Sequence, residues 1–125
     1  MPPPSGNEIT LPIIHEISCL YKELCISRKQ IPKMDRFGIY LRIENIVIEC
    51  LELAIAAALT EKDKKDILVE KLKIQIEISK KLIRLMWESK IITDKKYLLF
   101  EQKLQQISKM ASGWLKYLKP NSPRL

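Results

Sequence analysis

The amino-acid sequence predicts an all-α protein that folds as an up-down-up-down antiparallel four-helix bundle. Proline is confined to residues 2–32 and 120–123, so the long span between them contains none. There are only three glycines in 125 residues, and aromatic residues make up 6% of the chain, a composition that favours helices over sheet. Apolar residues recur every three or four positions in four segments. The short connections between these segments make consecutive helices antiparallel neighbours.

The first helix is predicted to begin at about residue 12 and to end near Lys29. Thr10 is its predicted N-cap, and Pro12 falls in the first turn, where a missing N–H is harmless. Pro32 ends the helix, because a proline disfavours helical geometry in the residue before it. Residues 1–10 are expected to form a flexible arm. The apolar stripe of this helix consists of Ile13, Ile14, Ile17, Leu20, Tyr21, Leu24 and Cys25.

The second helix is predicted from Asp35, as N-cap, to Leu59, and it is apolar over a wide arc. One seam consists of Phe37, Leu41, Ile48, Leu51, Ile55 and Ala58. The adjacent seam consists of Tyr40, Ile43, Val47, Cys50, Ala54 and Ala57. A helix with so wide an apolar arc must be covered on more than one side. One bundle of four helices needs less apolar surface than this, so contact between subunits is expected.

The third helix is predicted over residues 61–90. Thr60, followed three residues later by Asp63, fits the capping-box pattern at its start. The predicted core seam of this helix consists of Leu68, Leu72, Ile76, Ile83 and Met86.

The fourth helix is predicted to begin at Thr93 or Asp94 and to end near Leu118. Its apolar residues recur with a mean spacing of about 3.5, the period of shallow-angle packing in helical bundles. These residues are Phe100, Leu104, Ile107, Ala111, Trp114 or Leu115, and Leu118. The predicted bundle therefore spans residues 11–119 and is followed by a tail of residues 120–125.

The positive charge is concentrated in the second half of the chain. Residues 1–63 contain 7 basic and 9 acidic side chains, whereas residues 64–119 contain 14 basic and 6 acidic ones. A basic half predicts a polyanionic partner, because neutralising phosphates releases counterions. Lysine binds phosphate as a point charge, so largely sequence-independent binding of RNA and DNA backbones is expected. The candidate nucleic-acid-binding residues are Lys73, Lys80, Lys81, Arg84, Lys90, Lys96 and Lys103.

The alternative is that these lysines form a solvated, salt-bridged helical surface. Glu77 lies within the row formed by Lys73, Lys80 and Arg84, and it can pair with its basic neighbours. In that case the positive charge only keeps the protein in solution.

The sequence offers little from which to build a catalytic or metal site, and no enzyme activity, cofactor or metal is expected. His15 is the only histidine, and no glycine-rich phosphate loop is present. Glu49 and Glu52 place two carboxylates three residues apart on a helix, a pattern that can bind Mg²⁺ when facing helices add acids. Solvated carboxylates paired with lysines are the simpler interpretation.

The location of the protein is predicted to be cytoplasmic. Cys19, Cys25 and Cys50 form an odd set without CxxC spacing, which is typical of apolar packing residues in a reducing compartment. The N-terminus lacks the charged and apolar regions of a signal peptide. No apolar run approaches the length of a membrane span, so no membrane partner is expected.

Polar residues interrupt the start of the second helix, in the stretch RFGIYLRIEN at residues 36–45. Glu44 falls between Leu41 and Ile48 in one apolar seam, which predicts a carboxylate that points into packed surroundings. Such a carboxylate needs a cation and hydrogen bonds. Arg42 points elsewhere on the helix, so the partner is expected from another helix or another subunit. The alternative is a position at a wet edge of the bundle.

Three pieces of the sequence resemble a known family. RFGIYLRIENIVIECLELAIAA at residues 36–57 is followed by a lysine-rich helix and then by ISKMASGWLKYL at residues 107–118. Together they resemble the accessory variability determinant (Avd) proteins of diversity-generating retroelements. These proteins belong to a wider group of four-helix bundles that includes proteins encoded in ribosomal-RNA intervening sequences. This chain has lysine where many relatives have arginine, so no individual nucleic-acid contact is carried over.

The resemblance implies a small basic protein that assembles as a barrel-shaped homopentamer. It implies binding to the retroelement's reverse transcriptase and action with the template RNA, in a complex that makes adenine-mutagenised cDNA to diversify a target gene. It also implies roles in helix packing or the subunit interface for Arg36, Phe37, Arg42, Glu44, Asn45 and Trp114.

Two other functions fit the same sequence. A free-standing bundle of the intervening-sequence type, acting on ribosomal RNA, would share the fold and the charge, and the genomic neighbourhood would separate it from an Avd protein. A protein adaptor or chaperone with no nucleic-acid role would show no salt-dependent affinity for RNA or DNA.

Overall fold

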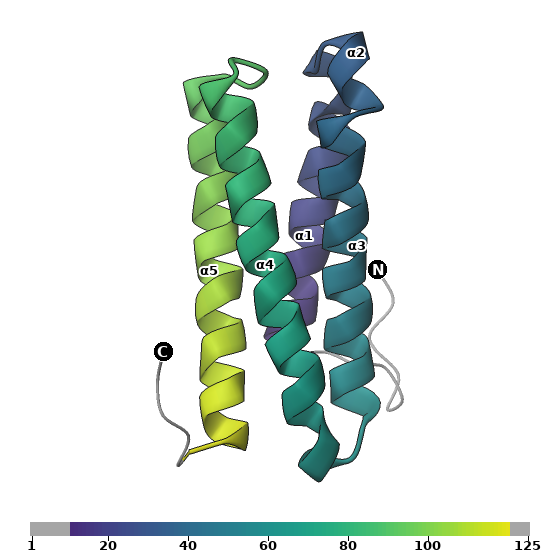
Figure 1. The fold of residues 1–125 in the computed structure, drawn as a ribbon, viewed down its shortest axis with the longest axis vertical. Coiled ribbons are helices and arrows are strands. Elements are labelled where there is room, and N and C mark those ends of the chain that lie inside the picture. The colour runs from purple at the N-terminus through teal and green to yellow at the C-terminus, as the bar shows by residue number, and fades with distance from the viewer. Residues whose placement is uncertain (1–10, 121–125) are drawn as a thin grey trace.

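The computed structural model describes residues 11–120, which fold as four long helices with no strand among them (Figure 1). The long helices are α1 (Pro12–Ser27), α3 (Ile39–Leu59), α4 (Lys65–Glu88) and α5 (Asp94–Leu118). The short elements are α2 (Lys33–Arg36) and two 3-10 helices, Arg28–Gln30 and Lys62–Lys64. The predicted all-α, antiparallel four-helix fold is confirmed. The predicted arm at residues 1–10, which includes Thr10, and tail residues 121–125 lie outside the described residues. The prediction that Thr10 caps the first helix is wrong, because α1 has Leu11 as its N-cap, in extended geometry and without a side-chain cap.

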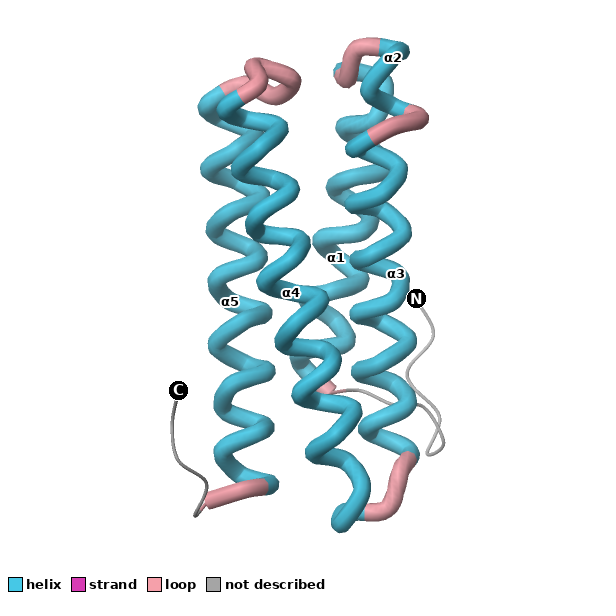
Figure 2. Tube along the Cα trace, viewed as in Figure 1, coloured by secondary structure: helices cyan, strands magenta, loops and turns pink. Residues whose placement is uncertain are grey.

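The four helices surround one core in the cyclic order α1, α3, α4 and α5. Consecutive helices run in opposite directions, as Figure 2 shows by the loops at alternating ends of the bundle. The end with α2 also carries the turn between α4 and α5, and the connection from α3 to α4 lies at the opposite end (Figure 1). The largest fully buried side chains include Tyr40, Phe100, Leu24, Leu72 and Ile107.

The second helix begins later than the sequence predicts. Asp35 is not an N-cap but lies inside α2, where its N–H donates to the Pro32 carbonyl at 2.9 Å. Proline is well suited to start a separate helical turn, and Gly38 interrupts it, because glycine is a weak helix former. α3 therefore begins at Ile39. Phe37 falls between the two helices, out of register with the predicted seam, and it is 67% exposed.

The start of the third helix also differs from the prediction. The Thr60 hydroxyl donates to the Ala56 carbonyl at 2.6 Å, so this residue ends α3 and does not cap α4. The ammonium group of Lys65 donates to the carbonyls of Ala57 and Ala58 at 2.9 and 3.1 Å. A cation is favourable at the negative end of a helix, and here it satisfies carbonyls that have no helical partner.

The start of the fourth helix is confirmed at Thr93. Its hydroxyl accepts a hydrogen bond from the Lys96 backbone N–H at 3.2 Å. The helix ends at Leu118, as predicted.

Only one of the two apolar seams of α3 belongs to the core of this chain. The seam that contains Tyr40, Val47 and Ala54 is buried throughout. In the other seam Phe37 and Ile48 are exposed. Leu41, Leu51, Ile55 and Ala58 are half-buried, and Leu51 packs against the core. The wide apolar arc is therefore fully covered on one side, whereas its outer side is only partly covered.

Two buried acidic groups of α3 make the fold sensitive to high pH. Burial raises the pKa of the Cys50 thiol to about 12, with a smaller contribution from the nearby Glu49 charge. Burial and then the Glu44 charge raise the pKa of Tyr40, whose hydroxyl donates to the Leu24 carbonyl at 2.5 Å. Both groups therefore remain protonated in the folded state at pH values where the unfolded chain has lost these protons.

Folding stability is expected to fall as the pH rises above about 9. The unfolded Cys50 thiol ionises near its ordinary pKa of 9.0, so its contribution to folding is intact below that pH and is lost towards pH 12. Cys50→Ala should therefore lose about 2–3 kcal/mol less stability than the parent chain between pH 9 and 11. Urea unfolding at several pH values measures this difference. Cys25→Ala, at an exposed site, is the control. Parallel pH profiles for Cys50→Ala and the parent would contradict the expectation.

Candidate functional site

Arg36, the first residue of the stretch RFGIYLRIEN, stabilises the turn between α1 and α3. The Arg36 side chain donates from Nε to the Ile31 carbonyl and from a terminal nitrogen to the Lys29 carbonyl, each at 2.8 Å. These carbonyls follow the end of α1 and have no helical partner. Arg36 therefore has a structural role within the chain.

Glu44 is buried, as predicted, and its partner comes from another element of the same chain. The carboxylate accepts a hydrogen bond from Arg28, a residue of the 3-10 helix that follows α1. Glu44 is 5% exposed, whereas the Arg28 side chain is 30% exposed. The Arg28 guanidinium also lies over the Phe37 ring, 5.4 Å from its centroid. This ion pair ties the end of α1 to α3.

The other expected packing residues differ in their surroundings. Trp114 is half-buried and packs against the core. Arg42 and Asn45 are exposed. Phe37 contributes no core packing, because the break at Gly38 moves it out of register with α3. Within the chain the Phe37 ring contacts Arg28 instead. A place in a subunit interface stays a prediction for Phe37, Arg42 and Asn45.

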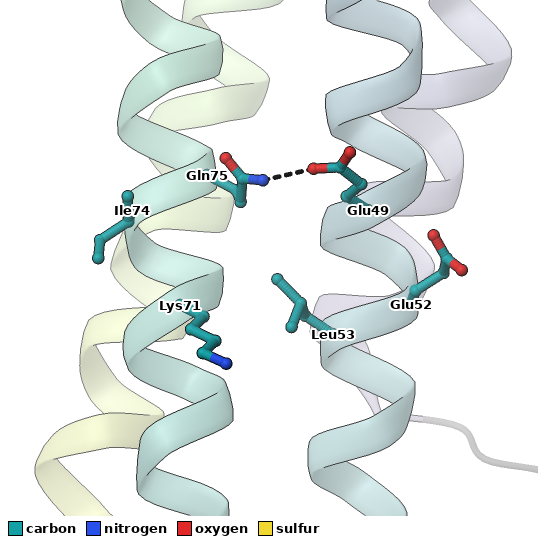
Figure 3. A pocket seen from close by; sticks show the side chains of 6 residues that line it. All are labelled: Glu49, Glu52, Leu53, Lys71, Ile74 and Gln75. Carbon is teal, nitrogen blue, oxygen red and sulfur yellow. Dashed lines mark hydrogen bonds between the residues drawn. The ribbon is translucent and has the colours of Figure 1, made fainter.

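A shallow groove with a volume of about 530 Å³ runs between α3 and α4 (Figure 3). Glu49 turns towards α4 and accepts a hydrogen bond from Gln75, whereas the Glu52 carboxylate points away on the other side of α3 (Figure 3). Lys71 and Leu53 complete the groove between the helices. The two carboxylates do not converge, and residues 11–120 contain no group of three potential metal ligands. The groove is therefore a poor candidate for a Mg²⁺ site.

Three of the predicted basic residues lie on the side of α4 that faces α5. This side is defined by Glu77, which accepts a hydrogen bond from Ser108 of α5 at 3.4 Å. Lys80 pairs with Glu77 at 3.1 Å, and only 19% of its side chain is exposed. Arg84 lies 3.6 Å from Glu88. Lys73 lies seven residues before Lys80, two helical turns away, and so shares this side of the helix. Their charge is partly neutralised by neighbouring carboxylates.

The remaining predicted basic residues do not join this row. Lys96 pairs with Glu23 of α1 at 3.7 Å, and Lys103 lies two turns further along the same side of α5. Lys81 is exposed on α4, and Lys90 lies in the turn between α4 and α5. The seven candidates are therefore distributed over several surfaces of the bundle.

The sequence analysis missed a column of lysines on the outer face of α5. Lys95, Lys109 and Lys116 are all exposed, and within residues 11–120 none of them pairs with a carboxylate. The three lysines are spaced by multiples of seven residues, and Gln102 occupies the remaining position between Lys95 and Lys109. Because seven residues make nearly two helical turns, successive positions lie about 10 Å apart along one face. The regular spacing was visible in the sequence. On α5 the predicted candidates were instead Lys96 and Lys103, which lie on a different side of the helix.

Both α3 and α4 carry exposed apolar side chains beside charged ones. On α4 these are Ile67, Ile74, Ile78 and Leu85, which form an outward stripe with Lys71 and Lys81 between them. On α3, Ile48 and Leu59 are exposed, and Glu52 lies between them. The two faces are both apolar, and their charges are of opposite sign.

These features define a class of protein: a small antiparallel helical bundle with open apolar faces on two helices and unpaired lysines on a third. None of the helices in residues 11–120 combines the length and apolarity needed to cross a bilayer. Comparison with protein-family models matches residues 13–118 to a family described as bAvd-like. The chain belongs to the bAvd-like family, which confirms the resemblance to Avd proteins. Comparisons with curated proteins and with solved structures returned no match.

Proposed function

We propose that this chain is the non-catalytic accessory protein of a diversity-generating retroelement. In this function it binds the reverse transcriptase together with the template RNA and the cDNA, and it supports mutagenic reverse transcription. The observation that carries the proposal is the family match, which extends from the beginning of α1 to the end of α5. The unpaired lysines of α5 support the nucleic-acid part of the proposal.

The nucleic-acid surface is centred on Lys95, Lys109 and Lys116. Exposed ammonium groups that lack a carboxylate partner are available to replace the counterions of a phosphate backbone. Lysines read no base sequence, which suits a protein that acts on templates of varied sequence. Lys90 at the turn and Lys73 beside α5 extend this surface along the bundle.

The assembled form is a homopentamer, built through the open faces of α3 and α4. A head-to-tail contact between two different faces closes into a ring when the rotation between subunits permits it. Apolar side chains such as Ile48 and Ile74 supply the burial, and Glu52 meets Lys71 or Lys81 of the neighbouring subunit. The face of α5 stays outside this contact and remains open to nucleic acid.

The absolute mass in solution, measured by light scattering at low and high salt, tests the proposal. The expected result is a pentamer that binds a structured RNA, loses affinity as salt rises, and co-purifies with the reverse transcriptase of a diversity-generating retroelement. Ile74→Asp should yield monomers, because a charge cannot be buried in the apolar contact without a partner. Leu98→Asp, at an exposed apolar residue of α5, is the matched control and should remain pentameric.

The other outcomes assign the chain to a different function. A monomer indifferent to RNA would contradict the proposal and favour a protein adaptor. An assembly that binds ribosomal RNA, without affinity for a reverse transcriptase, would favour the intervening-sequence type of function.

A further inference from the structure

The turn from α4 to α5 lies at one end of the bundle (Figure 2). Aromatic and basic side chains gather beside this turn. The rings of Trp87 and Tyr97 are stacked, with their centroids 4.6 Å apart and their planes inclined by 15°. The Arg84 guanidinium lies over the Trp87 ring, 5.3 Å from its centroid. Three flat groups from two helices therefore meet at one place on the surface.

Each member of this cluster is held by a further contact. The Trp87 Nε1–H donates to a carboxylate oxygen of Asp94 at 2.8 Å, which fixes the indole ring against the start of α5. The neighbouring Tyr97 side chain, followed by Glu88, raises the pKa of the Arg84 guanidinium. Trp87 and Tyr97 are half-buried against the core, but 52% of the Arg84 side chain remains exposed. The planar guanidinium is thus both oriented and open to solvent.

The adjoining turn contains a second unusual feature. Lys90 has a φ of 61°, and it is the only non-glycine residue with positive φ in residues 11–120. Its N–H donates to the Trp87 carbonyl at 3.0 Å, and the Ile91 N–H donates to the Met86 carbonyl at 2.8 Å, as in a helix-ending Schellman motif. Glycine or asparagine usually occupies such a position, because other side chains are strained there. The chain instead places a lysine beside the aromatic cluster.

We propose that Arg84, Trp87 and Tyr97 form a stacking platform for an unpaired base of single-stranded RNA or cDNA, with Lys90 contacting the adjacent phosphate. Bases in single strands stack on aromatic rings and on arginine planes, and every base has a suitable face. The platform therefore adds affinity for exposed bases without reading sequence. This inference rests on the proposed function, which supplies the nucleic acid, but it assigns a base contact that phosphate binding alone does not require.

The test compares a short single-stranded RNA with an abasic strand of equal length and charge. Base stacking on a protein platform changes affinity by about tenfold per base, so the parent chain should bind the complete strand about ten times more tightly. Arg84→Lys retains the charge but removes the planar group. It should reduce the ratio between the two strands to threefold or less, while the salt dependence of binding stays unchanged.

Tryptophan fluorescence locates the contact, because Trp87 and Trp114 are the only tryptophans in the chain. Trp87 is at the turn between α4 and α5, whereas Trp114 lies in the last turns of α5 at the other end of the bundle (Figure 1). In Trp114→Phe, the remaining Trp87 should be quenched by the complete strand and not by the abasic one. In Trp87→Phe, the signal of Trp114 should stay constant.

Equal affinity for the two strands, or unchanged Trp87 fluorescence, would overturn the stacking platform. Salt-dependent binding of the abasic strand would then still support the proposed function, so the two failures are distinguishable. Loss of reverse-transcriptase binding in Arg84→Lys, with the ratio between strands unaltered, would assign the cluster to a protein partner and would likewise overturn the inference.

Discussion

The triple variant Lys95→Glu, Lys109→Glu, Lys116→Glu is expected to bind single-stranded RNA about a hundredfold more weakly than the parent chain in low salt. Each substitution removes one phosphate contact and places a negative charge in the path of the strand. The slope of log affinity against log salt should also decrease in magnitude by about 2, because each lost contact with a single strand contributes roughly 0.7. Fluorescence anisotropy of a labelled strand across a salt series measures both quantities.

The matched control reverses the charge of three other exposed lysines, Lys22, Lys29 and Lys33, which lie on or beside α1 and α2. Both triple variants lower the net charge from +7 to +1. If position matters, the control should retain most of the parent affinity. Equal losses in the two variants would mean that binding follows net charge and that the face of α5 is not the binding surface.

Arg28→Met is expected to destabilise the bundle by about 2–4 kcal/mol. The substitution leaves the buried Glu44 carboxylate without its cation, and an unpaired buried charge costs far more than a broken surface pair. The value lies towards the lower part of the range for buried pairs, because the Arg28 side chain is itself 30% exposed. Urea unfolding at a fixed protein concentration measures the effect.

The double variant Arg28→Met, Glu44→Leu provides the decisive comparison. Removing both charges should restore most of the lost stability, since apolar residues often replace a buried ion pair without loss. Phe37→Ala, which removes the ring beneath Arg28 and leaves the ion pair in place, is the control and should cost less than 1 kcal/mol. A double variant no more stable than Arg28→Met would show that lost packing, and not the unpaired carboxylate, causes the effect.

The architecture was predictable from the sequence because it depends on the periodicity of apolar residues and on the residues that end helices. The seam of α5 and its Thr93 cap follow directly from residue spacing. Errors arose where two local signals compete. Thr60 has the hydroxyl of an N-cap residue, but the same hydroxyl can bond to the carbonyl four residues earlier, and only the path of the chain decides between them.

The partners of the polar residues were not predictable in the same way. The sequence indicates that Glu44 needs a cation, but Arg28 reaches it only because the turn after α1 folds back onto α3. Similarly, the spacing of Lys73 and Lys80 predicts a shared face, but it does not reveal that Glu77 neutralises part of it. The column of lysines on α5 could have been predicted from spacing alone, since Lys95, Lys109 and Lys116 are separated by multiples of seven residues.

The order of the helices around the core has a consequence for how quickly the chain folds. α3 packs mainly against α1 and α4, its neighbours in sequence, and α5 packs most closely against α4. Only the pairing of α1 with α5 joins distant parts of the chain, so folding requires a single long-range loop closure. Helical bundles with mostly local contacts fold in microseconds to milliseconds. Encounter between finished subunits, a concentration-dependent event, therefore sets the rate at which the proposed complex accumulates after synthesis.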